Sequence, residues 1–150
     1  MPIGFTILTA GINPPTPTIR FDVRWAVGAR WNGCPLRKDF CMAQGDDIQF
    51  IGRAKDFTGG LQDLTGVDDI VFAIYASRGG AEIFRVSLSG GGISQGSVDE
   101  FFFSIRTADS ADFARRSYWH ETLIVNSEGW RNTVLNGTFK VEQTYIGALT

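Results

Sequence analysis

The feature that most restricts the possible folds of this chain is a repeated alternation of apolar and polar residues in short segments. In residues 18–27, TIRFDVRWAV, every second residue from Ile19 to Val27 is apolar and the residues between them are mostly charged. A period of two places the apolar side chains on one face of an extended strand. Comparable segments recur at intervals of about 8–12 residues, separated by turn-forming residues. This rhythm predicts an all-β sandwich or barrel, and the hairpin-like connections predict antiparallel sheets.

The expected elements follow from the same pattern along the whole chain. Residues 70–75, IVFAIY, are apolar on both faces, which predicts a central strand covered on both sides. The preceding residues 57–66, FTGGLQDLTG, are expected to cross between the sheets, with Leu61 and Leu64 packing the turn against the core. The expected strands number about seven or eight and include residues 18–27, 48–55, 67–76, 81–88, 98–106, 117–126 and 133–146, the last with a bend at Asn136-Gly137.

One short helix is expected, at residues 107–116. Asp109 or Ser110 is placed to cap its start, where backbone N–H groups lack partners. Arg115 and Arg116 lie near its end, where positive charge is favourable.

Length and composition fit one globular domain, or one domain with an appended arm. Hydrophobic residues make up 43% and charged residues 20% of the 150 residues, which suits a packed core. The net charge of −2 argues against general nucleic-acid binding. Residues 1–40 carry five basic and two acidic side chains (+3), and the remainder carries nine and fourteen (−5). This uneven distribution suggests head-to-tail contact between copies, and chance is the alternative.

The N-terminal residues 1–17 are expected to form an extended arm before a sandwich domain at residues 18–150. Three prolines between Pro14 and Pro17 exclude a helix and favour polyproline geometry. A stiff arm loses less entropy on docking to a neighbouring subunit than a flexible one; a frayed terminus is the alternative interpretation. The candidate subunit-contact residues are Pro14, Pro15, Pro17, Arg20, Arg24 and Trp31.

No residue pattern predicts a catalytic, cofactor-binding or metal site. Cys34 and Cys41 lack zinc-ligand spacing and are expected as thiols, with a local disulfide as the alternative. His120 is the single histidine; its neighbours Ser117 and Glu121 do not converge with it from one strand, so local packing is the better interpretation.

Acidic pairs and tryptophans offer two further possibilities. Residues 46–47, 68–69 and 99–100 are acidic, but their spacing matches no calcium loop, so solvated turns are expected. Residues 1–10 lack a secretory signal and the apolar runs are too short for a membrane helix, so synthesis in the cytoplasm and no membrane partner are expected. An exposed aromatic platform for glycan would use Trp25, Trp31, Trp119 or Trp130.

Residues 45–146 resemble a pattern found in small phage virion proteins and in N-terminal domains of upper-baseplate and tail-fibre proteins. These have a strand beginning "GD", a "DLTG"-like turn, a buried strand, a tyrosine-bearing strand and a final "G-x-F-x-V" strand. The matching residues are 45–50 (GDDIQF), 61–66 (LQDLTG), 70–75 (IVFAIY), 101–105 (FFFSI), 107–116, 118–123 (YWHETL) and 137–141 (GTFKV), while the first 44 residues depart from the pattern.

The resemblance implies an immunoglobulin-like antiparallel β-sandwich that builds part of a virion without catalysis. The expected protein is a tail, baseplate or fibre-attachment component whose copies assemble symmetrically with one another and with other virion proteins. Three alternatives stay open: a capsid decoration or neck protein of the same fold, a carbohydrate-binding sandwich, and an enzyme whose pocket would gather His120 with distant carboxylates.

Overall fold

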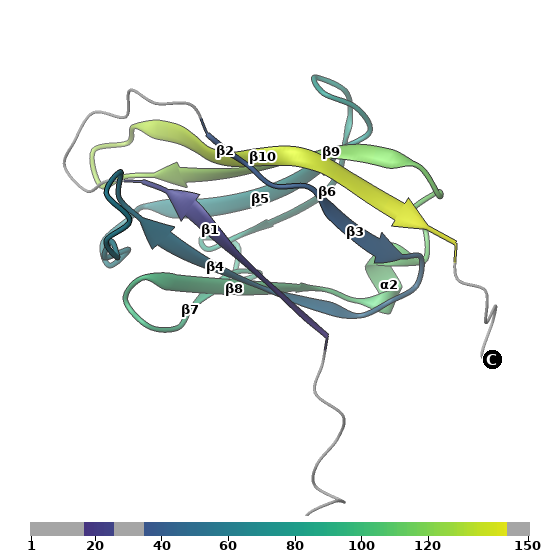
Figure 1. Cartoon of the computed structure of the whole chain (residues 1–150), viewed down its shortest axis with the longest axis horizontal. Coiled ribbons are helices and arrows are strands. Elements are labelled where there is room, and N and C mark those ends of the chain that lie inside the picture. The colour runs from purple at the N-terminus through teal and green to yellow at the C-terminus, as the bar shows by residue number, and fades with distance from the viewer. Residues whose placement is uncertain (1–16, 26–34, 144–150) are drawn as a thin grey trace, which may run out of the picture.

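The computed structural model describes residues 17–25 and 35–143, which form a β-sandwich of two facing sheets (Figure 1). The strands are β1 (Thr18–Arg24), β2 (Leu36–Arg37), β3 (Phe40–Ala43), β4 (Ile48–Lys55), β5 (Asp69–Tyr75), β6 (Glu82–Ser87), β7 (Ser94–Gln95), β8 (Glu100–Ile105), β9 (Ser117–Val125) and β10 (Arg131–Glu142). This confirms the all-β sandwich. The strands beyond the expected seven or eight are short ones, of which β2 and β7 have two residues each.

The sheets are mixed, so the prediction of antiparallel pairing throughout was wrong. One sheet has the order β1-β4-β8-β7, and the other has the order β2-β10-β9-β5-β6, with β3 also paired to β10. The β1–β4 pair is parallel, as are the pairs of β2 and β3 with β10. The reason is that the chain leaves β1, crosses to the opposite sheet for β2 and β3, and returns for β4, which no hairpin would do.

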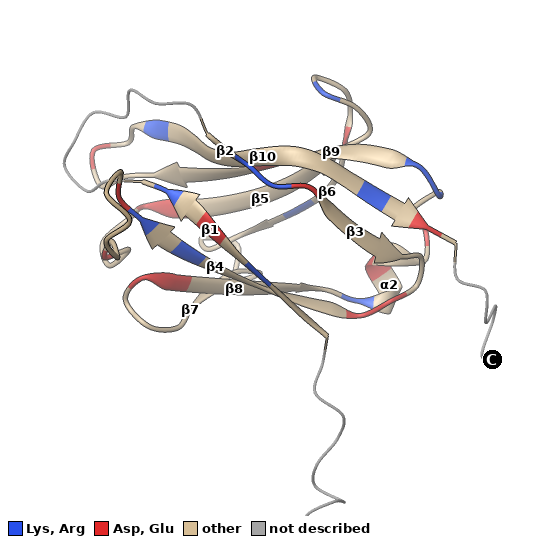
Figure 2. Cartoon of the chain, in the orientation of Figure 1, with Lys and Arg blue, Asp and Glu red and all other residues tan. Residues whose placement is uncertain are grey.

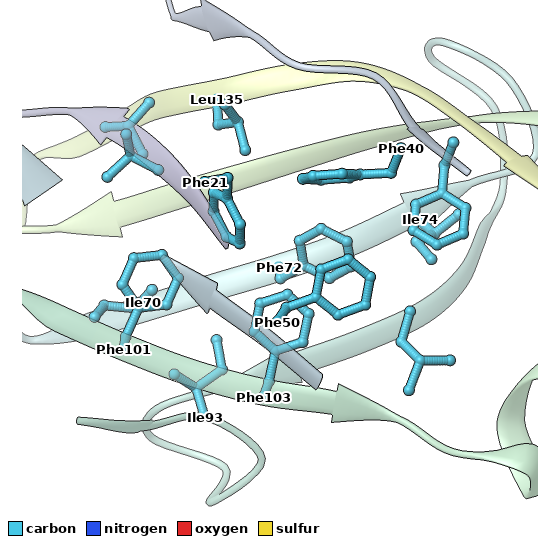
Figure 3. Close-up of a cluster of buried hydrophobic side chains, with 14 of the residues drawn as sticks. Phe21, Phe40, Phe50, Ile70, Phe72, Ile74, Ile93, Phe101, Phe103 and Leu135 are labelled. Carbon is cyan, nitrogen blue, oxygen red and sulfur yellow. The ribbon is translucent and has the colours of Figure 1, made fainter. Parts of the chain in front are cut away.

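The core between the sheets is built largely from phenylalanine rings. Phe50 of β4 stacks on Phe103 of β8 with ring centroids 5.0 Å apart, and Phe103 lies 4.5 Å from Phe72 of β5. Phe21 of β1 meets Phe40 of β3 edge to face at 5.4 Å (Figure 3). Each ring removes a large apolar area from water, so this cluster joins the two sheets.

The predicted strand faces are confirmed. Phe21, Val23 and Trp25 are buried from β1, and β8 alternates between buried and half-buried residues. Residues 70–74 of β5 are all buried, as expected for a strand covered on both faces.

The connection from β4 to β5 crosses between the sheets as predicted, but only one of its two leucines packs against the core. Leu64 is completely buried, whereas Leu61 is 59% exposed. Leu61 forms an isolated bridge with Lys55 at the rim, so its side chain lies outside the core.

The bend predicted at Asn136-Gly137 does not occur, because β10 runs unbroken from Arg131 to Glu142. A Cβ built on Gly137 would lie 2.1 Å from the Lys38 carbonyl oxygen. This glycine therefore permits close approach of the β2–β3 backbone rather than a turn.

The predicted helix is much shorter than residues 107–116. Helix α2 covers only Thr107–Ser110, so Arg115 and Arg116 do not lie in it. Asp109 is its third residue rather than its cap, and its carboxylate accepts the Arg106 N–H at 3.1 Å. Residues 111–116 then form turns and bends, within which Phe113 is buried in the core.

Candidate subunit-contact surface

The candidate contact residues that the structure describes, Pro17, Arg20 and Arg24, lie on or beside β1. This strand is at the end of its sheet and pairs only with β4 among the described strands (Figure 1). Pro17 precedes it directly and is exposed. The other three candidates, Pro14, Pro15 and Trp31, lie outside the described residues.

The backbone of β1 directs alternate residues toward β4. The Pro17 carbonyl accepts the Gln49 N–H at 2.9 Å, and the Trp25 N–H donates to the Lys55 carbonyl at 2.9 Å. In a strand, the N–H and C=O of one residue point to the same side and the next residue's point to the opposite side. The odd-numbered residues of β1 therefore bond to β4, and Arg20, Asp22 and Arg24 direct their backbone groups to the open edge.

The charged side chains on the outer face of this sheet are largely paired. Asp22 lies 3.2 Å from the Lys55 ammonium, and the Arg53 guanidinium lies 2.7 Å from Glu100. The hydrogen bond from Arg53 lowers the pKa of Glu100 below its usual value. Figure 2 shows basic and acidic residues alternating along β1 and basic residues toward the end of β4. Surface ion pairs of this kind each contribute little to the stability of the fold, so their main effect is to hold the charged groups in defined positions.

A shallow hollow of about 280 Å³ lies on this outer face. It is lined by Arg20, Phe21, Asp22, Ile51, Arg53 and Glu100. Sequence reasoning identified Arg20 but missed Asp22, Ile51, Arg53 and Glu100 as its neighbours. The alternation of β1 and β4 gave the outward direction of Asp22, Ile51 and Arg53, but only the pairing of both β1 and β8 with β4 brings these side chains and Glu100 together.

Apolar side chains gather beyond the C-terminal end of β1. The Arg24 guanidinium lies 5.8 Å from the centroid of the Phe57 ring, which is 46% exposed. Leu61 follows Phe57 on the same β4–β5 connection and is more exposed still. A contact surface along β1 thus has charges in its middle and apolar groups near one end.

His120 has a structural role. The sequence predicted this, because it favoured local packing of His120 over catalysis. Its side chain is completely buried beside Phe40, with ring centroids 4.6 Å apart. One ring nitrogen, Nε2, lies 2.6 Å from the Lys38 carbonyl oxygen. Burial lowers the pKa of His120 to about 4. A neutral, buried imidazole whose Nε2 is held by a backbone carbonyl is unsuited to act as the base of a catalytic triad.

The cysteines and acidic pairs also lack a reactive arrangement among the described residues. Cys41 is an exposed free thiol whose pKa is raised by desolvation and by Glu142, while Cys34 lies outside the described part. Asp47 accepts hydrogen bonds from Thr107, and Asp69 accepts them from Ser89. No group of three or more histidine, cysteine or acidic side chains suited to a metal ion is found in the described ranges.

The described tryptophans do not form one platform. Trp25 is in the core, and Trp119 is only 9% exposed because Arg37 and Arg78 lie over its ring at 5.4 and 4.9 Å. Trp130 is 53% exposed at the turn between β9 and β10. Trp31 lies outside the described residues.

Comparisons with known proteins give structural similarities only. Within the described ranges, no helix is long and apolar enough to cross a membrane. No family model and no curated protein sequence matches the chain. Among solved structures, the N-terminal domain of phage TP901-1 ORF48 is similar at 11% identity and a TM-score of 0.47, covering 84% of this chain and 99% of that one. CopC from Methylosinus trichosporium OB3b is similar at 15% identity and 0.39, covering 70% and 84%. The bradyzoite-specific antigen BSR4 from Toxoplasma gondii is similar at 6% identity and 0.41, covering 88% and 51%.

Proposed function

We propose that this chain is a non-enzymatic structural protein of a phage virion, a tail, baseplate or fibre-attachment component, whose copies associate through the N-terminal arm. The sequence resemblance of residues 45–146 supports the virion role. The observation that carries the association is the position of β1, a regular seven-residue strand at the end of its sheet that begins directly after the Pro-rich arm. An arm that begins at this point lies next to a strand edge with which no other described strand pairs, and a second copy can dock there.

The other roles have less support from the described residues. A carbohydrate-binding sandwich needs exposed aromatic side chains side by side, and Trp25 and Trp119 are buried in separate places. An enzyme needs titratable groups that converge in a cleft, and His120 is enclosed by aromatic rings. A capsid decoration or neck protein of the same fold would use the same contact surface and is the closest alternative.

The association is tested by the mass of the protein in solution. Light scattering coupled to size exclusion should give a multiple of the 16.5 kDa chain for the full sequence and the mass of one chain after deletion of residues 1–16. The deletion keeps Pro17, whose carbonyl bonds to Gln49.

Two controls make the result decisive. A variant in which residues 1–16 are replaced by glycine and serine keeps the length and should also have the mass of one chain. Thermal unfolding checks that both variants remain folded. A full-length chain of single mass at all concentrations, or a deletion that leaves the mass and incorporation into phage particles unchanged, would contradict the proposal.

A further inference from the structure

The open edge of β1 carries backbone hydrogen-bonding groups without a partner among the described residues. Arg20, Asp22 and Arg24 direct their N–H and C=O groups away from β4, and no other described strand pairs with β1. Such groups act as a template for another strand, because each is an obligatory donor or acceptor.

Proteins usually protect such an edge, and β1 has few of the devices that do so. It is seven residues long, contains no proline, and keeps one register with β4 from Thr18 to Arg24 without a bulge. Its inward side chains, Phe21 and Val23, are apolar and buried. The far end of the same sheet is different, since β7 has only two residues. Charges lie on the outer face of β1 but do not block its backbone.

We propose that the open edge of β1 binds residues 3–8 of a second copy as an added strand, so that two copies exchange arms. This inference rests on the proposed function and names its docking site. Residues 3–8, IGFTIL, are uncharged and rich in β-branched and aromatic side chains, which suit a strand. Main-chain hydrogen bonds provide the affinity in this mode of recognition, and alternate side chains provide the specificity.

The sequence of the arm favours a second copy over the chain's own β1. Pairing within one chain requires the chain to reverse between residues 9 and 17, and the three prolines Pro14, Pro15 and Pro17 favour an extended conformation over such a reversal. Sixteen extended residues span about 50 Å, whereas a seven-residue strand spans about 23 Å. The arm is therefore long enough to leave one domain and lie along β1 of its neighbour.

The surroundings of the edge suit an apolar strand. Beside it, Phe21 of β1 meets Phe40 of β3 across the gap between the sheets, with ring centroids 5.4 Å apart. Alternate apolar side chains of the added strand would continue this line of rings at the side of the sandwich. The side chains on the outer side of the added strand would lie next to the charged face of β1. Thr6, the polar residue of the segment, would be one of them.

Two substitutions at one position test the edge. Asp22→Pro removes an N–H on the open side while every ladder bond to β4 remains, because Asp22 does not bond to β4. Asp22→Ala removes the same carboxylate and its ion pair with Lys55 but keeps the N–H, so it is the matched control. We expect Asp22→Pro to weaken self-association about tenfold or more, and Asp22→Ala to leave it within about twofold.

Cross-linking provides a second measurement that does not depend on how well a proline is tolerated. In a chain with Cys34→Ser and Cys41→Ser, Thr6→Cys and Arg24→Cys are introduced into separate full-length proteins, which are mixed and treated with a short bismaleimide. We expect a covalent dimer that joins the two variants. A third protein carries both cysteines in one chain. If it forms only intramolecular cross-links at low concentration, and no covalent dimer at any concentration, the exchange is overturned.

The outcomes separate this inference from the proposed function. If deletion of residues 1–16 reduces the mass to one chain but Asp22→Pro and Asp22→Ala behave alike and no mixed dimer forms, the arm docks elsewhere and the inference is wrong. If the full chain never self-associates, the proposed association itself fails.

Discussion

His120 should make the stability of this domain depend on pH between about 4 and 6.5. Its Nε2 atom donates to the Lys38 carbonyl, which places the second nitrogen, Nδ1, without a hydrogen-bond partner among the described residues. Protonation of Nδ1 would put a charge in a buried site between Phe40 and Phe72. This is why burial lowers the pKa of His120 from 6.5 to about 4.

The direction follows from proton linkage. Between pH 6.5 and 4 the unfolded chain binds a proton that the folded protein excludes, so stability is full above pH 6.5 and is lost as the pH falls toward 4. At about 1.4 kcal/mol for each pKa unit, the loss is about 2 kcal/mol by pH 5 and about 3 kcal/mol in total. Carboxylates such as Asp39 and Glu100 have pKa values lowered from 3.8 and 4.5, so their contribution is lost only at more acidic pH.

Chemical denaturation at pH 7.5 and 5.0 measures this effect. The wild-type chain should lose about 2 kcal/mol of unfolding free energy between these values, whereas His120→Phe, whose ring fits the same aromatic surroundings, should lose much less. A wild-type stability that does not change between pH 7.5 and 5.0, or a His120→Phe variant with the same dependence as wild type, would refute this reasoning.

Five further substitutions test the packing by thermal or chemical unfolding. Gly137→Ala should cost about 2–3 kcal/mol because its Cβ would meet backbone, whereas Gly96→Ala meets only ordinary contacts at 3.5 Å and should be nearly neutral; equal effects would contradict the close approach. Thr122→Val should raise stability by about 1 kcal/mol, since the buried hydroxyl has no partner among the described residues, and a loss would show that it has one. Leu64→Ala should lower the free energy of unfolding by about 2–5 kcal/mol and Leu61→Ala by less than about 0.5 kcal/mol. A larger loss for Leu61→Ala than for Leu64→Ala would mean that Leu61 is the core residue.

Local periodicity was sufficient to predict which face of a strand is turned to the core. In β9, Tyr118, His120, Thr122 and Ile124 share the buried face as their spacing indicated, and β8 and β5 agree with their patterns in the same way. Period two follows from backbone geometry within one strand, so it needs no knowledge of the rest of the fold.

The pairing of strands was not predictable from such local signals. Asn136-Gly137 has the sequence of a turn, but a glycine is needed at position 137 because the backbone of Lys38 lies too close for a side chain. The parallel β1–β4 pair depends on the chain crossing to the other sheet and back between them. Consequently the neighbours of Arg20 in the candidate surface, such as Arg53 and Glu100, were beyond reach of the sequence alone.

Amide hydrogen exchange on the full-length chain tests the central claim, that copies associate at the open edge of β1, most directly. In the associated protein, Phe21 and Val23 are protected by β4 and Arg20, Asp22 and Arg24 by the added strand, so all five amides should exchange slowly. Dilution below the association range should accelerate exchange at Arg20, Asp22 and Arg24 and leave Phe21 and Val23 protected. Exchange at Arg20, Asp22 and Arg24 that is fast at every concentration would contradict the account.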